Sequence, residues 1–361
     1  MTTFGIEEEY FLVHPLTLRP VSLADAVLTD LAPSTAGSGL VTHEFLASQL
    51  ERSTAVFTEL AEAEADLIDF RRQLGSVARL HGVLAAGTGT TFDAQATPTL
   101  TDSARYHRLG SGVRGVVRDH EICATHVLVG VPDRETGVHA LNGVRVWLPT
   151  LLALTGNSPF WRGRKTGFDS WRAVLMRRWA TTGCPPAFAD AADYDERIHR
   201  LVGVGATVDT ATVAWYARLS ETFPTLEVRV ADAQLDPAPA LLLAALTRAL
   251  VVTGVAAAER GAPPPALEPE LLDAALWHAS RDGILGELLD PGTRELAPAR
   301  QVTDSLRRYA GDALDAAGDS ARVEDLIERL WRAGTGAQRQ LGAFRTGGPS
   351  GLRGLFEQAF A

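Results

Sequence analysis

The sequence predicts an α+β protein built on a mostly antiparallel sheet, with helices packed against one face. Strand-like segments, rich in β-branched and aromatic residues or alternating in polarity, occur at 4–13, about 40–54, 123–132 and 226–235, and 82–91 reads as a strand that runs into a loop. Long helical segments separate them without a regular strand–helix–strand repeat, and from residue 239 onward the chain reads as helix after helix. That distribution favours an antiparallel sheet over a parallel one. The uncovered face of such a sheet is then free to form an open, concave site.

The helices are predicted from apolar residues at helical spacing. The clearest one extends from about residue 57 and ends at Gly82, a residue type that often follows a helix C-terminus. The other helical segments are about 22–32, 137–154, 168–179, 190–205, 269–283, 301–317 and 321–334. The chain has no internal repeat and only short Pro/Gly-rich stretches, at 31–39, 183–188, 261–270 and 345–351. We therefore expect a single domain over residues 1–361, strand-rich over 1–235 and helical over 239–345.

Composition excludes several classes of protein. The formal net charge is −10, with 44 acidic and 34 basic side chains, which argues against a nucleic-acid-binding protein because phosphate recognition needs a basic surface. The two cysteines, Cys123 and Cys184, form no Cys-x-x-Cys pair and no zinc-ligand spacing. A disulfide scaffold is therefore not expected, and a reducing compartment suits this chain.

The most apolar stretch lies at residues 240–258 and has about the length of a membrane span. Arg248 lies at its centre, where a charge costs roughly 3 kcal/mol on membrane insertion. A buried core helix is the better interpretation. The N-terminus is acidic and has no basic region followed by an apolar run, so no signal peptide is expected. These features predict a cytoplasmic protein with no membrane partner.

Paired carboxylates mark the first predicted strand, "FGIEEEYFLV" at 4–13. Successive side chains of a strand point to opposite faces. Glu7 and Glu9 therefore share one face, whereas Glu8 lies on the other with Ile6 and Tyr10. Glutamate is depleted in strands, so two carboxylates side by side need an explanation.

Three further strands place polar side chains in a similar way. Glu227 and Arg229 share a face of 226–235, and His126 shares a face of 123–132 with Leu128. The second strand adds Glu51, and also Glu44, which falls on the opposite face unless a bulge or bend intervenes.

If these strands share a sheet, the carboxylates and one imidazole converge. Clustered carboxylates repel one another unless a cation neutralises them, and oxygen ligands with few histidines favour Mg²⁺ or Mn²⁺ over zinc. An arginine beside them would bind a phosphate or carboxylate. The alternative is an ordinary solvated face of an antiparallel sheet, and the spacing alone leaves both interpretations open.

Two aromatic and basic segments are weaker candidates for anion binding. "SPFWRGRKTGFDSWR" at 158–172 carries Arg162 and Arg172, and "ARYHRL" at 104–109 carries Arg105 and Tyr106. For each segment, a solvated basic turn is the alternative. The "GTGTT" loop at 87–91 lacks the Gly-Lys-Ser/Thr of a P-loop, so an ordinary glycine loop is favoured. No nucleophile elbow and no Gly-x-Gly-x-x-Gly motif follows a strand.

Several segments together resemble the carboxylate–amine ligase family often described as type 2 glutamate–cysteine ligases. They occur in the family's order, cover about residues 4–250, and read "GIEEEYFLV", "SQLERSTAVFTELAEA", "AAGTGTT", "ARYHRL", "ATHVLVGVPDRETG", "WLPTLLALTGNSPFWRGRKTGFDSWR" and "TLEVRVADAQLD". The resemblance implies a glutamine-synthetase-like fold with a curved, mostly antiparallel sheet, and one catalytic domain. It implies ATP-dependent amide formation through an acyl phosphate, nominally from glutamate and cysteine.

The resemblance also implies roles for the candidate residues. Those that look like ligands of Mg²⁺, or of Mn²⁺, are Glu7, Glu9, Glu44, Glu51, His126 and Glu227. Glu227 and Arg229 look catalytic, the arginine as a clamp on the phosphate or transition state. Candidates for binding ATP or the acid substrate are Arg162, Arg172, Arg105 and Tyr106. The expected partners are a small acid and a small amine, and a homodimer is compatible with the family.

Two positions depart from the family pattern. The strand usually reads His-Val-His-Val-Gly, but Leu128 replaces the second histidine here, and Arg52 stands where an uncharged residue is common. Because the acidic residues are all present, we favour a working ligase with an altered substrate preference. The alternatives are a ligase for a different acid and amine in specialised biosynthesis, a phosphoryl transferase acting on a guanidino group, and a non-catalytic nucleotide- or metabolite-binding homologue.

Overall fold

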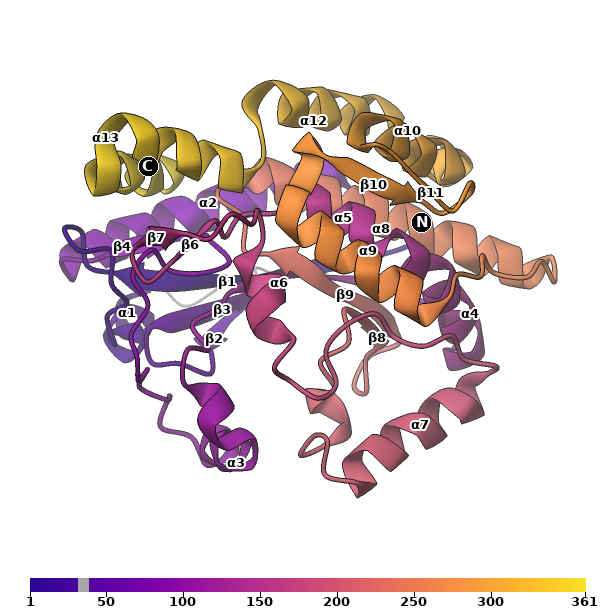
Figure 1. Ribbon diagram of the computed structural model, residues 1–361, viewed down its shortest axis with the longest axis horizontal. Coiled ribbons are helices and arrows are strands. Elements are labelled where there is room, and N and C mark those ends of the chain that lie inside the picture. Colours follow the sequence, from indigo (N-terminus) through magenta and orange to yellow (C-terminus); the bar gives the residue numbers. More distant parts are fainter. Residues whose placement is uncertain (32–38) are drawn as a thin grey trace.

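The main sheet of the computed structural model, which describes residues 1–31 and 39–361, has seven strands (Figure 1). Their order is β2-β3-β1-β5-β9-β8, and β4 pairs with the end of β1. The strands are β1 (Phe4–Val13), β2 (Leu40–His43), β3 (Gln49–Ser53), β4 (Leu84–Ala86), β5 (Ala124–Gly130), β8 (Ala217–Leu219) and β9 (Thr225–Asp232). Every described pairing within this sheet is antiparallel. The predicted α+β fold with a mostly antiparallel sheet is confirmed.

Helix α8 (Pro237–Glu259) is at the centre of the layer that covers one face of the sheet. It contacts β1 and β5 of the sheet, and among the helices α2, α4, α11 and α12. The other α-helices are α1 (Ala24–Asp30), α2 (Leu60–Leu80), α3 (Ala104–Val113), α4 (Arg134–Val144), α5 (Leu148–Leu154), α6 (Trp171–Met176), α7 (Ala191–Gly203), α9 (Pro269–Asp282), α10 (Ala299–Tyr309), α11 (Gly311–Ala317), α12 (Ser320–Ala333) and α13 (Gly336–Ala359).

Among the described residues, α8 is the one helix long and apolar enough to cross a membrane, with a mean hydropathy of 2.0. It is instead largely buried inside the protein, as predicted. Its central Arg248 is 3% exposed, forms an ion pair with Asp319, and lies 4.8 Å from the centre of the Phe4 ring. A buried charge is tolerated when it is paired, which explains an arginine inside an otherwise apolar helix.

The two faces of β1 have different environments. Ile6, Glu8 and Tyr10 are buried toward the helices. The Tyr10 hydroxyl and the Arg71 guanidinium of α2 both donate to the Glu8 carboxylate. At the other end of the chain, Phe360 stacks edge-on against Tyr10, with ring centres 5.6 Å apart. The predicted orientation of Glu8, away from Glu7 and Glu9, is therefore confirmed.

One local prediction was wrong, and two local features were not predicted. The expected strand at 40–54 is a hairpin, because residues 44–48 leave the strand conformation and β3 turns back to pair with β2. The Pro/Gly-rich stretch at 345–351 lies inside α13, which kinks at Gly348 and continues beyond residue 345. Two short ribbons were not expected, namely β6 (Phe160–Trp161) with β7 (Arg164–Lys165) and β10 (Glu287–Asp290) with β11 (Glu295–Pro298). Most of the predicted loop at 31–39 lies outside the described residues.

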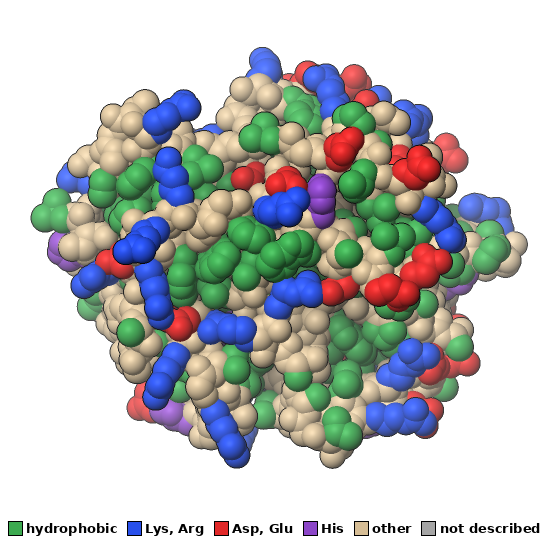
Figure 2. All heavy atoms as spheres, in the orientation of Figure 1, with side chains coloured by type: hydrophobic (Ala, Val, Ile, Leu, Met, Phe, Trp, Pro, Cys, Tyr) green, Lys and Arg blue, Asp and Glu red, His purple; other side chains and the backbone are tan. Residues whose placement is uncertain are grey.

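Charge is unevenly distributed over the surface. Basic side chains gather on the face seen in Figure 2 toward the left and lower left, where Figure 1 shows α3 and the β6–β7 ribbon. The exposed basic residues of these elements include Arg108 of α3 and both Arg164 and Lys165 of β7. A chain with a net charge of −10 thus carries a locally basic surface.

Candidate active site

A pocket of about 440 Å³ lies on the face of the sheet opposite α8. Strands β1, β3 and β9 supply acidic side chains to its floor and β5 supplies His126, whereas α3 and the residues around α6 supply part of its wall. The acidic side chains that line it are Glu7, Glu9, Glu44, Glu51 and Glu227. The convergence predicted from strand alternation is therefore present in the fold.

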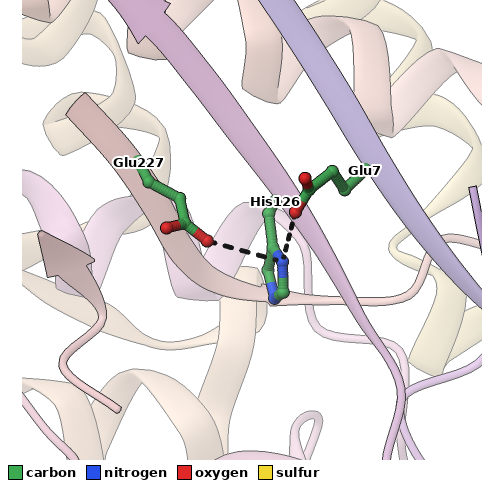
Figure 3. A group of neighbouring side chains, drawn as sticks. All are labelled: Glu7, His126 and Glu227. Carbon is green, nitrogen blue, oxygen red and sulfur yellow. Dashed lines mark hydrogen bonds and ion pairs between the residues drawn. The ribbon is translucent and has the colours of Figure 1, made fainter. Parts of the chain in front are cut away.

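His126 is at the centre of this cluster. Its Nδ1 lies 3.3 Å from an oxygen of Glu7 and 3.8 Å from an oxygen of Glu227, and its Nε2 lies 3.7 Å from Glu9. Figure 3 shows the Glu7 and Glu227 carboxylates approaching the imidazole from the two neighbouring strands, β1 and β9. The pairing of β5 with β9 shifts register between Thr125 and Val127, so His126 lies at an irregularity in the ladder.

Glu9 and Glu51 are direct cross-strand partners on β1 and β3. Like charges directly opposite each other in a sheet are destabilising. Two sets of side chains bring potential ligand atoms within 4.8 Å of one another, namely Glu7, His126 and Glu227, and Glu9, Glu51 and His126. Each set could hold one cation, and His126 is common to both.

Burial makes several of these carboxyls hard to ionise. It raises the pKa of Glu9 to about 7, with a further rise from the neighbouring Glu51. It raises the pKa of Glu44 to about 8, with a contribution from Glu9, and that of Glu51 well above its ordinary value. A bound divalent cation would remove this cost, so the donor set fits Mg²⁺ or Mn²⁺.

His126 and Glu7 differ from those three carboxyls. Burial and the charge of Arg229 lower the pKa of His126 to about 4, so its imidazole is neutral near pH 7 and can act as a metal ligand. Burial opposes ionisation of Glu7, but the hydrogen bond with His126 and the charge of Arg229 bring its pKa below the ordinary value.

Glu227 lies between two arginines. Arg218 Nε donates to one of its oxygens at 2.8 Å, and Arg229 donates to the other. Although burial opposes ionisation, the charges of Arg229 and then Arg218 hold the pKa of Glu227 well below its usual range. The site therefore contains a permanent carboxylate with two cations beside it, an arrangement that can bind a phosphate next to a metal ion.

The other predicted residues are distributed as follows. Glu44 reaches the pocket because the chain leaves β2 at this point, which supplies the bend that strand alternation required. Arg105 and Tyr106 of α3 and Arg172 of α6 line the pocket. Arg162, in the turn between β6 and β7, does not line the pocket. Its side chain is 54% exposed and forms an ion pair with Asp119.

Sequence reasoning missed part of the wall. Arg218, His120 and Trp179 line the pocket, and the Trp179 indole donates to His120 Nδ1 at 3.1 Å. Burial and the nearby Arg178 lower the pKa of His120 to about 3, so this imidazole is also neutral. Arg218 lies between the buried Ala217 and Leu219, and this alternation was the available signal for it.

Known proteins resemble this chain over nearly its whole length. The model of the family "Glutamate-cysteine ligase family 2 (GCS2)" matches residues 3–357. A Saccharopolyspora erythraea protein named "Putative glutamate–cysteine ligase 2-2" is 37% identical over 361 residues, which cover 99% of this chain and 92% of that protein. A Frankia alni protein of the same name is 38% identical over 354 residues, covering 95% of this chain and 92% of its own.

Two solved structures share the fold. A glutamate–cysteine ligase from Francisella tularensis in complex with AMP superposes with a TM-score of 0.72 at 12% identity, covering 99% of this chain and 89% of that one. A bifunctional glutathione synthetase from Pasteurella multocida gives a TM-score of 0.71 at 14% identity, covering 99% of this chain and 52% of that one. The fold matches that of known ligases, and the chain belongs to glutamate–cysteine ligase family 2.

Proposed function

We propose that the protein is an ATP-dependent carboxylate–amine ligase that forms an amide through an acyl phosphate. The observation that carries this proposal is the pocket in which five glutamates and a neutral His126 come together, with Arg218 and Arg229 beside them. Family membership adds the reaction class. The relatives are named for glutamate and cysteine, and one structural neighbour holds AMP.

The glutamates and His126 would hold the Mg²⁺ or Mn²⁺ ions that accompany ATP. When bound, these ions neutralise the phosphate oxygens and lower the repulsion met by an attacking carboxylate. The residues assigned to them are Glu7, Glu9, Glu44, Glu51, His126 and Glu227. The raised pKa values of Glu9 and Glu44 support this assignment, because burial and neighbouring carboxylates make both groups costly to ionise and a bound cation would relieve that cost.

The arginines would act on the transferred phosphoryl group. A carboxylate oxygen of the acid substrate attacks the γ-phosphorus of ATP, the bond to the bridging oxygen breaks, and ADP leaves. The amine then attacks the acyl carbon, and inorganic phosphate and a proton leave as the amide forms. Arg229, held against Glu227 at the pocket floor, can compensate the charge that develops on the phosphoryl oxygens.

Arg172, Arg105 and Tyr106 are assigned to the binding of ATP or the acid substrate because they line the pocket. The position of Arg162 outside that lining does not support the same role. Glutamate and cysteine are the first substrates to test. A cytoplasmic location, the absence of membrane and nucleic-acid partners, a single catalytic domain and a homodimer remain predictions.

The direct test is ADP release by the purified protein with Mg-ATP, glutamate and cysteine, with the products analysed by mass spectrometry. We expect ADP and γ-glutamylcysteine in equal amounts. ADP release that depends on another acid–amine pair, with that amide as product, would retain the ligase chemistry and correct the substrates. Absence of ADP release with every pair in a panel of amino acids and amines would contradict the proposal.

Leu128 favours one alternative, a non-catalytic homologue that binds a nucleotide. Its side chain lines the pocket, and it is the cross-strand partner of Glu227. Calorimetry separates the two functions, because a binding protein would take up Mg-ATP yet release no ADP. A phosphoryl transferase would give a stable phosphorylated product and no amide.

A further inference from the structure

Asp232, at the end of β9, is a fully buried carboxylate outside the pocket lining. Its Oδ1 accepts a hydrogen bond from the Ser170 hydroxyl at 2.8 Å. Its Oδ2 accepts from the Ser158 hydroxyl at 2.7 Å and from the Asn157 backbone N–H at 2.8 Å. Burial raises the pKa of Asp232, whereas the charge of Arg172 and these hydrogen bonds favour the ionised carboxylate.

The hydroxyls of Ser158 and Ser170 connect Asp232 to the first residues of α6. The Ser158 hydroxyl accepts from the Arg172 backbone N–H at 3.0 Å. The Ser170 hydroxyl accepts from the Ala173 N–H at 3.2 Å and is the N-cap of α6. Because each hydroxyl proton is committed to Asp232, each serine oxygen is oriented as an acceptor toward the helix.

The Arg172 side chain returns to the same strand. Its guanidinium donates to the backbone oxygens of Arg229 at 3.0 Å and Val230 at 3.2 Å, and its Nη1 lies 3.9 Å from Asp232 Oδ1. The side chain is 3% exposed, yet it forms part of the pocket wall. Asp232 therefore acts on Arg172 twice, through the backbone and through charge.

The "GTGTT" loop fits against this carboxylate. A Cβ added at Gly89 would lie 2.5 Å from Asp232 Cγ, so only glycine allows the backbone so close. The Gly89 N–H donates to the Asn157 backbone oxygen at 3.0 Å, which joins the loop to the same segment. The glycine loop thus packs against the Asp232 network.

We propose that Asp232 is a positioning residue that fixes Arg172 in the wall of the active site and thereby sets the affinity for the substrate anion that Arg172 binds. This inference rests on the proposed ligase function and names a residue that does not touch substrate. On this proposal, the loop at 87–91 and the segment at 157–170 together hold the Arg172 guanidinium in place.

The test is a double-mutant cycle on the KM values for ATP and for the acid substrate. We expect Asp232→Asn to raise one of these KM values at least fivefold while the other changes less than twofold. Arg172→Lys should raise the same KM value. When Asp232→Asn is added to Arg172→Lys, we expect less than a further twofold change, because the group that Asp232 positions has already been altered.

Asp319→Asn is the matched control. Asp319 is also a buried carboxylate paired with an arginine, Arg248, but it lies in the helical layer. It should lower stability and leave both KM values within twofold of wild type. Unchanged KM values in a folded Asp232→Asn variant, or fully independent effects in the cycle, would overturn the inference.

Hydrogen exchange provides a readout that does not need activity. Asp232→Asn should accelerate exchange of the Arg172 and Ala173 amides at least tenfold, and Asp319→Asn should not. If Asp232→Asn does not fold, Ser158→Ala removes one link and is subject to the same two measurements. An inactive wild-type protein would contradict the ligase function itself, whereas an active one with an insensitive Asp232 would contradict only the positioning role.

Discussion

Replacement of Arg71 by methionine tests the buried ion pair behind the active-site strand. Arg71 and Glu8 are each 2% exposed, and their closest atoms, Nη2 and Oε1, are 2.5 Å apart. Arg71 also donates to the backbone oxygens of Gln234 and Leu235, each at 3.0 Å. Arg71→Met would leave the Glu8 carboxylate buried without its cation, which costs about 3–5 kcal/mol of the free energy of unfolding.

That loss is a large share of the roughly 5–15 kcal/mol that stabilises a typical protein. The assay is urea unfolding followed by circular dichroism, with the slope of the transition checked for a change of mechanism. Arg72→Met is the control, since Arg72 is 63% exposed and lies 3.8 Å from Asp69; we expect a change within about 0.5 kcal/mol. A loss below about 1 kcal/mol for Arg71→Met would refute the reasoning, because it would mean that Glu8 does not depend on this cation.

Three further predictions concern the site and its surroundings. Glu7→Gln, Glu9→Gln and Glu227→Gln should each lower turnover more than tenfold with an unchanged circular dichroism spectrum, and activity retained in all three would contradict the metal-site assignment. Leu128→His should lower the Mg²⁺ concentration needed for half-maximal activity; an unchanged titration would place Leu128 away from the metal. Glu121, outside the pocket, has a pKa raised to about 7 by burial, so its stabilising contribution is full below about pH 4.5 and is lost as the pH rises through 7. Relative to Glu121→Gln, the wild type should therefore lose on the order of 3 kcal/mol between pH 5 and pH 8 in urea unfolding, and parallel pH profiles would show that this carboxyl titrates normally.

Alternation along single strands was enough to predict the acidic floor of the site. The positions of Glu7 and Glu9 on one face, and of Glu227 and Arg229 on another strand, depend only on the two-residue period of a strand. The alternation around Arg218 spans only three residues, which is too short to predict a strand, and alternation does not place Arg162. Arg218 reaches the site through the pairing of β8 with β9. Arg162 lies outside the pocket lining and forms an ion pair with Asp119, which is 43 positions earlier in the chain.

The fold class was predictable because it follows from where strands and helices concentrate along the chain. The hairpin at 40–53 was not, because the turn at 44–48 contains neither glycine nor proline and reads as continuous strand. The β10–β11 ribbon escaped prediction for a related reason: its strands have four residues each and lie among long helices. Short strands carry too little periodicity to be recognised without their partners.

The contact between Phe360 and the first strand has a consequence for how the protein is made. The Phe360 ring packs on Tyr10. The Phe360 backbone oxygen lies so close to Gly75 that a Cβ added there would be only 2.2 Å from it. During synthesis, β1 and α2 emerge from the ribosome long before residue 360 exists, so the apolar surface around Tyr10 lacks this contact until Phe360 has been made. A nascent chain that stalls before this residue would present an unfinished core to chaperones and proteases. Only chains that reach Phe360 can close it.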